Sequence, residues 1–549
     1  MHGGSTMPVS PFDTHEVTNQ PPPFAPRDLW VDDLALREAV AREGGHAFEP
    51  RLAAYGALAG GELLRLADEA HRDRPRLRTH DRFGHRIDRV EFNAAYHEVM
   101  GIAIANGVAG LSWHESQPGA HVARAALGYL HYQAEPGSSC PLTMTHAAVP
   151  VLRHEPGLRE WADKAAMPHY DGRDVPMAGK RGITLGMGMT EKQGGSDVRS
   201  NTTRATPLAG EGEYALVGHK WFFSAPMSDA FLVLAQAPAG PTCFLLPRWR
   251  ADGTRNALRL MRLKDKLGDW SNASSEVEFE NAWAHRIGDE GRGIATILGM
   301  VMLTRLDCML GSAGLMRMAL AQAMHHARHR MAFGKLLVDQ PLMRNVLADL
   351  ALESEAATAF ALRLAGAVDR ASTDSGEAAF ARIATAIGKY WICKRAPGFA
   401  NEAQECLGGN GYVEESLLPR LYRQAPLNSI WEGSGNIQCL DALRALSREP
   451  EAREALLAEL HGASGIDAAF DAALAKCEAA LSARTDEAHA RGLVEHFALL
   501  LQGAILLRAR SPLARDWCAS RLGGGRGGTY GTLVSGIDLD AAIGRALPG

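Results

Sequence analysis

The spacing of apolar residues divides the chain into four parts. From Asp28 to about Gly179 apolar residues recur at helical spacing, as in Leu34–Val40, and Ala, Leu, Arg and Glu dominate. Residues 1–26 are instead rich in Pro, Gly and small polar residues, which predicts an extended arm. We therefore expect an N-terminal helical domain with an extended arm over residues 1–180.

A period of two replaces the helical period between Ile183 and Ile287. Segments typical of strands are Tyr214–Val217, Phe231–Leu234 and Glu276–Phe279. Turn clusters separate them, notably Gly210-Glu211-Gly212 and Asp252-Gly253. This pattern predicts a compact antiparallel β domain over residues 181–290.

The helical period returns after the glycine-rich stretch at 288–293 and persists to the C-terminal region. We predict a helix bundle over residues 291–446 and an extra helical domain over 447–549 that loosens after Arg521. The order of helices, β domain, bundle and extra helices fits an α+β multidomain protein. It matches neither a βαβ alternation nor a TIM barrel.

Composition narrows the class of protein. The 549 residues are 46% hydrophobic and 22% charged, as in globular proteins, and the net charge of -5 argues against coating nucleic acid by bulk charge. The eight cysteines show no C-x-x-C spacing, which is typical of reduced thiols in a cytoplasmic protein. No signal peptide is apparent, and the longest apolar run, Phe497–Leu507, is too short to span a bilayer. We expect a cytoplasmic protein without membrane contact.

The segment 428–436 places one carboxylate, Glu432, among residues that neither neutralise nor crowd it. Gly433 and Gly435 permit close backbone approach to a flat ligand, and Trp431 supplies an apolar wall. A carboxylate in such surroundings stays protonated longer, which suits a general base near neutral pH. The alternative is an ordinary loop.

Two further segments carry candidate binding groups. In 187–197 a predicted strand runs into a Gly-Gly-Ser-Asp turn, which can hold a hydrogen-bonding ring edge or a phosphate, or can be a simple tight turn. In Lys220–Ala225, Phe222 and Ser224 share one face of a predicted strand. They offer a stacking surface and a hydrogen bond, as a flavin needs, unless the strand is buried on both sides.

Taken together, five segments resemble the acyl-CoA dehydrogenase superfamily. Thr190-Glu191 with Gly195-Ser196-Asp197 is similar to its flavin-edge segment, and Lys220–Ala225 to its strand over the ring. Arg330–Lys335 resembles its Arg-x-x-Phe-Gly motif, and Leu407–Tyr412 and Ile430–Ser434 resemble its two C-terminal signatures. Segments 187–205, 262–268 and 428–436, with the extra helical C-terminus, resemble the AidB branch, and the likeness then covers nearly the whole chain.

The resemblance implies an FAD cofactor and the residues that bind it. These are Met187, Met189, Thr190, Gly195, Ser196, Phe222, Phe223, Ser224, Arg330, Phe333, Gly409, Ile430, Trp431, Gly433, Ser434 and Asn436. In the family the motif arginine meets the FAD pyrophosphate across a subunit interface. The resemblance to the AidB branch also implies a homotetramer.

The resemblance also implies the chemistry. In the family a carboxylate removes a proton from Cα of an acyl thioester while the flavin accepts a hydride from Cβ. Glu432 matches that base, and Arg305 is assigned to the substrate. Some relatives carry the base on the first helix after the β domain, where this chain has Thr304. Met302 and Glu405 also depart from the family pattern, at positions that in relatives help to orient CoA and touch the cofactor.

Binding of double-stranded DNA and a role in the alkylation response are implied by the AidB likeness, with weak dehydrogenation of short or branched acyl-CoA. Residues 447–549 as a whole are not basic, but Arg508, Arg510, Arg515, Arg521 and Arg526 form a local excess over Asp516. They predict contacts with DNA phosphates, or else a solvated helix face. The alternatives are a metabolic acyl-CoA dehydrogenase that passes electrons to an electron-transferring flavoprotein, and a DNA-binding module with a structural flavin.

A metal site is not predicted. His325 and His329 have the spacing of metal ligands on a helix, but no third ligand accompanies them.

Overall fold

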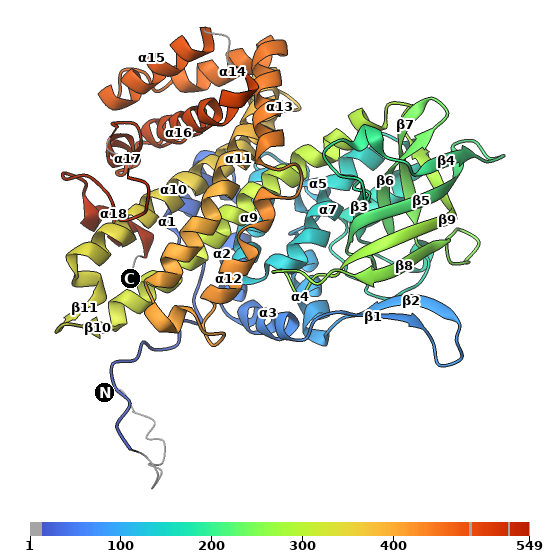
Figure 1. Cartoon of the computed structure of the whole chain (residues 1–549), viewed down its shortest axis with the longest axis horizontal. Helices are drawn as coiled ribbons and strands as arrows, with labels where there is room; N and C mark the ends of the chain where they lie inside the picture. The colour runs from blue at the N-terminus through green and yellow to red at the C-terminus, as the bar shows by residue number, and fades with distance from the viewer. Residues whose placement is uncertain (1–13, 483–485, 525–526, 548–549) are drawn as a thin grey trace.

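The computed structural model describes residues 14–482, 486–524 and 527–547 (Figure 1). In its N-terminal part, helices pack against the bundle on one side and the β domain on the other. The helices are α1 (Leu34–Arg42), α2 (Glu49–Ala59), α3 (Glu62–Arg72), α4 (Ala94–Ala105), α5 (Leu111–His114), α6 (Ala120–Ala134), α7 (Pro136–Arg153) and α8 (Arg159–Ala166).

A β-hairpin that the sequence pattern did not predict interrupts these helices. It consists of β1 (Arg76–His80) and β2 (Arg86–Glu91), which pair antiparallel and project from the molecule along β8 (Figure 1). Asp81 fixes its turn, because one carboxylate oxygen accepts from the backbone N–H groups of Phe83 and His85 at 2.8 and 2.9 Å. Residues 72–91 carry seven arginines and few β-branched residues, so the composition hides the strands.

The β domain is a seven-stranded sheet that closes on itself. Its strands are β3 (Leu185–Gly188), β4 (Arg204–Pro207), β5 (Glu213–Ser224), β6 (Ala230–Ala237), β7 (Gly240–Pro247), β8 (Leu258–Leu263) and β9 (Ser274–Ile287). The order is β3-β6-β4-β5-β9-β7, with β8 on β9 and an added β6–β7 pairing. Most pairings are antiparallel as expected, but β3 and β4 run parallel to β6.

Three long helices form the bundle. They are α9 (Gly293–His329), α10 (Pro341–Arg370) and α11 (Ser375–Glu405), followed by the shorter α12 (Leu418–Gln424) and α13 (Gly435–Arg448). The small hairpin of β10 (Met331–Ala332) and β11 (Lys335–Leu336) lies beyond the far end of α9. Helix α9 packs on α10 and α11 and also on α6 and α7, so it is central to the molecule.

The C-terminal extension packs onto this bundle. It contains α14 (Pro450–His461), α15 (Ala468–Ser482), α16 (Ala490–Arg508), α17 (Ala514–Arg521) and α18 (Leu539–Ala546). Helices α14 and α16 pack on α11, and α18 returns to α10 and α1. One hydrophobic core runs from the N-terminal helices through the bundle into the extension. The extension is therefore part of the main body.

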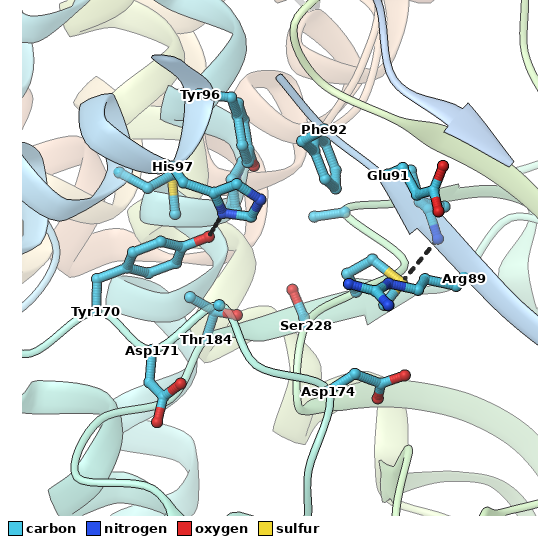
Figure 2. A pocket seen from close by; sticks show the side chains of 16 residues that line it. Arg89, Glu91, Phe92, Tyr96, His97, Tyr170, Asp171, Asp174, Thr184 and Ser228 are labelled. Carbon is cyan, nitrogen blue, oxygen red and sulfur yellow. Dashed lines mark hydrogen bonds between the residues drawn. The ribbon is translucent and has the colours of Figure 1, made fainter. Parts of the chain in front are cut away.

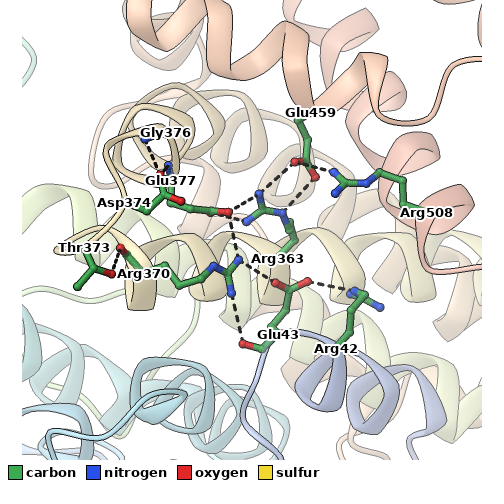
Figure 3. A network of polar contacts seen from close by, with 10 residues as sticks. All are labelled: Arg42, Glu43, Arg363, Arg370, Thr373, Asp374, Gly376, Glu377, Glu459 and Arg508. Atoms are coloured by element: carbon green, nitrogen blue, oxygen red, sulfur yellow. Dashed lines mark hydrogen bonds and ion pairs between the residues drawn. The ribbon is translucent and has the colours of Figure 1, made fainter.

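A network of ion pairs crosses the same boundaries (Figure 3). The Arg363 guanidinium of α10 contacts Glu377 at 2.7 Å and Glu459 of α14 at 3.0 Å. Arg370 links Glu377 to Glu43, which follows α1. Charges from the N-terminal part, the bundle and the extension thus satisfy one another.

Among the described residues, two apolar helical segments are long enough to cross a membrane by length and composition, Gly293–His329 and Glu487–Arg508. In the most apolar stretch of each segment, 61% and 78% of the residues respectively are buried inside the protein. Packing at the centre of the bundle accounts for their apolar character.

Candidate active site

Glu432 lies on a turn between the short helix Leu427–Ser429 and α13, in an unusual backbone conformation. Its φ is 58°, in the left-handed region, and Gly433 follows with φ of 91°. A non-glycine residue in this region costs about 1 kcal/mol or more, so the surrounding contacts must hold it.

Buried donors grip the backbone on both sides of the carboxylate. Lys389 of α11, only 1% exposed, donates to the carbonyls of Trp431 and Gly433 at 2.6 and 2.5 Å. The Glu432 carbonyl accepts from Arg305 Nε and Gln438 Nε2, each at 3.0 Å. Three successive carbonyls are therefore held from behind, which fixes the direction of the Glu432 side chain.

The Glu432 carboxylate is held by Thr304, which stands where some relatives carry the catalytic base. Thr304 Oγ1 donates to Glu432 Oε2 at 2.7 Å and also lies 3.0 Å from the Val301 carbonyl. Burial raises the pKa of Glu432, opposed by the hydrogen bond from Thr304 and by the charges of Lys389 and Arg305. A carboxylate with a raised pKa and one defined hydrogen bond is suited to accept a proton.

Arg305 contacts the backbone of Glu432 and not its carboxylate. It is 7% exposed, its Nε holds the Glu432 carbonyl and its Nη1 contacts Asp441 at 2.9 Å. Asp441 is shared with Arg382 at 2.8 Å. The structure thus gives Arg305 a role in positioning Glu432, while its contact with a substrate stays a prediction.

The strand β5 presents one exposed aromatic ring. Phe222 is 54% exposed on a domain whose other aromatic rings are largely buried, and Ser224, on the same face, hydrogen-bonds Ser274 at 3.0 Å. Met187 and Met189 lie half-buried on the neighbouring β3 segment. An exposed flat ring beside hydroxyls and thioethers suits the stacking and edge contacts of an isoalloxazine.

Phe223 does not belong to this surface. Its side chain is fully buried and packs on Phe231, with ring centroids 4.1 Å apart. Because side chains alternate along a strand, a residue between Phe222 and Ser224 must point into the sheet. A contact between the Phe223 side chain and the cofactor is therefore excluded, while a contact through its backbone stays a prediction.

The flavin-edge loop is anchored to β5 by a buried ion pair. Trp221 N–H donates to the Thr190 carbonyl at 2.9 Å, and Lys220 Nζ contacts Glu191 Oε1 at 2.8 Å with both side chains fully buried. Burial opposes ionisation of Glu191, but the Lys220 charge and hydrogen bonds from Lys220 and Thr203 lower its pKa to about 2. A Cβ on Gly195 would lie 2.4 Å from Thr190 Oγ1, so a larger residue there would displace the Thr190 side chain, and Ser196 is exposed beside it.

The C-terminal signatures end at an open surface. Ile430 is 62% exposed, Ser434 and Asn436 are exposed, and a Cβ on Gly409 would meet no atom within 4 Å. Asn436 Oδ1 accepts from Arg491 of α16 at 2.9 Å. The extension therefore reaches the rim of the candidate site.

Arg330 and Phe333 lie at the other end of the molecule. Along α9 the distance from Thr304, which contacts Glu432, to the end of the helix at Arg330 is about 40 Å at 1.5 Å per residue. Phe333 is 98% exposed with φ of 52°, and Arg330 Nη1 donates to the Asn19 carbonyl at 2.6 Å. The β10–β11 hairpin and the strands β3 and β5 stand at opposite ends in Figure 1. One chain does not bring the whole predicted cofactor set together.

The predicted DNA-contacting arginines have different surroundings. Arg521 is buried and paired with Asp349 and with Glu353 at 3.3 Å, so it is not available on the surface. Arg508 contacts Glu459 at 2.9 Å. Arg510 and Arg515 are exposed without an ion-pair partner among the described residues, and Arg526 lies outside them. Arg521 is wrong as a phosphate contact because its partners lie on α10, far away in sequence.

The β1–β2 hairpin is a basic surface that sequence reasoning missed. Its seven arginines between residues 72 and 91 face four acidic residues. Arg76 and Arg78 form exposed ion pairs, and Arg86 pairs with the half-buried Asp88. Arg82 and Arg89 have no ion-pair partner among the described residues. Exposed ion pairs contribute little, so these side chains can exchange their partners. The sequence feature that could have indicated this strand is the arginine at every second position from 72 to 78.

Within the described ranges no group of three His, Cys, Asp or Glu residues could hold a metal ion. The ring of His325 bonds the Pro22 carbonyl at 2.8 Å, and that of His329 bonds its own helix.

Comparisons with known proteins fit this geometry. Three family models match in order, "Adaptive response protein AidB N-terminal domain" over residues 19–172, "Acyl-CoA dehydrogenase, middle domain" over 186–282, and "Acyl-CoA dehydrogenase, C-terminal domain" over 291–447. The chain is 48% identical over 512 residues to the putative acyl-CoA dehydrogenase AidB of Escherichia coli, covering 92% of this chain and 94% of that protein. The chain belongs to the AidB branch of the acyl-CoA dehydrogenases.

Further relatives support this membership. Acyl-CoA dehydrogenase family member 11 of Caenorhabditis elegans is 30% identical over 438 residues, 77% of this chain and 70% of that protein. The structure of C. elegans ACDH-11 in complex with C11-CoA superposes with a TM-score of 0.84 at 26% identity, covering 98% of this chain and 93% of that one. The structure of the Bd2924 apo-form superposes with a TM-score of 0.84 at 27% sequence identity, covering 90% of this chain and 100% of that one. As a member of this branch the chain is an FAD-dependent oxidoreductase.

Proposed function

We propose that Glu432 is the catalytic base of an AidB-type acyl-CoA dehydrogenase that also binds duplex DNA in the response to alkylation, in the cytoplasm. The carboxylate held between Thr304 and the clamped backbone is the observation that carries the enzymatic half of this proposal. Bound FAD supplies the hydride acceptor. The residues of this chain supply the base, the stacking ring of Phe222 and the backbone that aims the carboxylate.

The base removes the proton at Cα of a short or branched acyl thioester. Glu432 receives that proton at Oε1 or Oε2, and Thr304 keeps the carboxyl oriented in both protonation states. Arg305 and Lys389 place positive charge near the anion without pairing it directly, which leaves the carboxylate free to react. Electron-transferring flavoprotein is the proposed electron acceptor.

The proposed cofactor site needs a second chain. Glu432 contacts Thr304 in the first half of α9, and Arg330 and Phe333 follow the C-terminus of that helix. Strand β5, which carries Phe222 and Ser224, stands at the opposite end of the molecule from the β10–β11 hairpin in Figure 1. A fully exposed phenyl ring in a left-handed conformation is costly in water and is covered if a neighbouring subunit docks there. This supports the homotetramer expected from the resemblance.

Anaerobic bleaching of the flavin by short and branched acyl-CoA tests the enzymatic half. We expect Glu432→Gln to bind FAD as the wild type does and to lose bleaching by at least a hundredfold, because the amide cannot accept the proton. The matched variant Glu454→Gln, exposed on α14, should bleach normally. Unimpaired bleaching in Glu432→Gln would falsify the assignment.

The DNA half rests on the exposed arginines. Arg510 and Arg515 on the extension, and Arg82 and Arg86 on the hairpin, are placed to contact phosphates, and a two-stranded ribbon fits the major groove. Two double variants, Arg510→Ala with Arg515→Ala and Arg82→Ala with Arg86→Ala, test these surfaces in a gel-shift series at rising salt. Each should bind DNA more weakly and with a shallower salt dependence, because fewer phosphate contacts release fewer counterions on binding. Arg521→Ala is unsuitable as a probe, since it breaks a buried pair. Unchanged affinity in both double variants removes these surfaces from the proposal.

A further inference from the structure

A cavity of about 300 Å³ lies between the N-terminal helices and the β domain (Figure 2), and Glu432 is not among the residues that line it. Strand β2, helix α4, the loop after α8 and the turn between β5 and β6 surround it. None of the predicted flavin-binding residues lines it. Ala225, which directly follows Ser224, forms part of its wall.

One wall of the cavity is flat and apolar. Phe92 and Tyr96 stack with ring centroids 4.2 Å apart and planes at 13°, so Tyr96 backs one face of the Phe92 ring. Phe92 stays half-buried and lines the cavity together with Met100 and Met227. This wall suits a planar or apolar ligand body.

Every carboxylate that lines the cavity already has an arginine partner. Asp171 pairs with Arg173 at 2.6 Å, and Asp174 with Arg248 at 2.8 Å and Arg255 at 2.6 Å. Glu91 contacts Arg78 at 3.3 Å. Arg89 lines the cavity, its guanidinium lies over it in Figure 2, and it has no ion-pair partner among the described residues.

A buried hydroxyl faces the same space. Ser228 is 3% exposed, lines the cavity, and its Oγ has no hydrogen-bond partner in the described part of the chain. A buried polar atom without a partner is unusual in a folded protein and asks for an explanation. His97 is already bonded to Tyr170 Oη at 2.8 Å, and burial, then the charge of Arg89, lowers its pKa, so it adds no second positive charge.

We propose that this cavity binds a small organic carboxylate with a flat apolar body. The carboxylate would accept from the Arg89 guanidinium and the Ser228 hydroxyl, and the body would lie against Phe92. A single unmatched guanidinium fits a monoanion, whereas a phosphate dianion would keep an uncompensated charge. Neither the dehydrogenase chemistry nor DNA binding uses these residues.

The test is calorimetric titration of the full-length, FAD-loaded protein with benzoate and with its neutral counterpart benzamide. We expect saturable benzoate binding, and about tenfold or more weaker binding of benzamide, because the charge-assisted hydrogen bond is lost. Arg89→Met should weaken benzoate binding about tenfold or more, and Ser228→Ala about threefold. Arg82→Met, on the same hairpin outside the cavity, is the matched control and should bind like the wild type.

Several outcomes overturn the proposal. The first two are the absence of saturable benzoate binding at millimolar concentration and a benzamide affinity equal to that for benzoate. The others are an unchanged benzoate affinity in Arg89→Met and a loss of benzoate affinity in Arg82→Met equal to that in Arg89→Met. Full competition by acyl-CoA would also overturn it, because it would place benzoate in the site of Glu432. An unchanged flavin spectrum shows that each variant is folded.

Discussion

The Thr304 hydroxyl has one proton and two acceptors within reach, the carboxylate of Glu432 and the carbonyl of Val301. While Glu432 is ionised, the proton can point to the carboxylate. After Glu432 has taken a proton, the carboxyl can donate to the hydroxyl oxygen, and the hydroxyl proton can turn to Val301. Thr304 can therefore hydrogen-bond Glu432 whether Glu432 is ionised or protonated. This keeps the orientation of the Glu432 carboxyl group constant through proton transfer.

Thr304→Val tests this role. The change removes the hydrogen bond that lowers the pKa of Glu432, so that pKa rises further. Since the ionised form is active, the acid limb of the pH profile for flavin reduction should move to higher pH. At neutral pH the rate should fall about three- to tenfold. Thr304→Ser restores the hydroxyl and should restore the profile, whereas an unshifted acid limb in Thr304→Val would show a merely structural role.

Sequence reasoning reached Glu432 because the chemistry of that segment is local. It could not show that Thr304 and Lys389, which lie 128 and 43 positions earlier in the chain, hold it. The same limit affected Arg521, whose acidic partners on α10 no local pattern reveals.

At the scale of the element, the flavin-edge loop depends on its anchor to β5. Glu191 and Lys220 belong to different segments of the β domain, and their ion pair is fully buried. The backbone N–H groups of Thr202 and Thr203 also donate to Glu191, at 2.7 and 3.2 Å. The loop that carries Thr190 and Gly195 is therefore held at its centre.

Glu191→Gln should release this anchor. Lys220 would stay buried without a counter-charge, which costs about 3–5 kcal/mol of unfolding free energy. Because the folded-state pKa of Glu191 is about 2, below its ordinary value, the wild type keeps this contribution above about pH 4 and loses it as pH falls toward 2. Urea unfolding across this range should show a larger acid-dependent loss in the wild type than in Glu191→Gln, since other paired carboxylates titrate in both proteins. Glu211→Gln, exposed on a turn, should match the wild type, and equal stability of both variants would contradict the anchor.

The elements also show what periodicity can predict. The change from helical to alternating spacing located the β domain, and alternation along β5 placed Phe222 and Ser224 on one face. The same alternation put Phe223 inside, which the family likeness had obscured. The β1–β2 hairpin was not predicted because it is rich in arginine, a residue that occurs in helices and strands alike.

For the whole molecule, the ion-pair network and the shared core make the extension inseparable from the bundle. Arg363 contacts carboxylates of both α11 and α14, and Arg545 of α18 contacts Glu38 of α1 and Glu355 of α10. Such contacts join residues at opposite ends of the chain.

Arg363→Met should weaken the whole protein. Its removal leaves Glu377 and Glu459 with only Arg370 and Arg508 as partners, and we expect a loss of about 2 kcal/mol. The midpoint of urea unfolding should fall for signals from the flavin and from helical structure together. Arg510→Met, which breaks no ion pair among the described contacts, serves as the control. A fall confined to part of the helical signal would show that the extension unfolds by itself.

The separation of Phe222 and Glu432 from Arg330 and Phe333 along α9 also bears on how the enzyme behaves in dilute solution. If each working site draws residues from two chains, as proposed, the number of sites follows the law of mass action in the chain itself. Activity per milligram then depends on protein concentration, and dilution releases the cofactor as it separates the chains. Variants that merely weaken the contact between subunits would look like catalytic mutants in a dilute assay and like the wild type in a concentrated one.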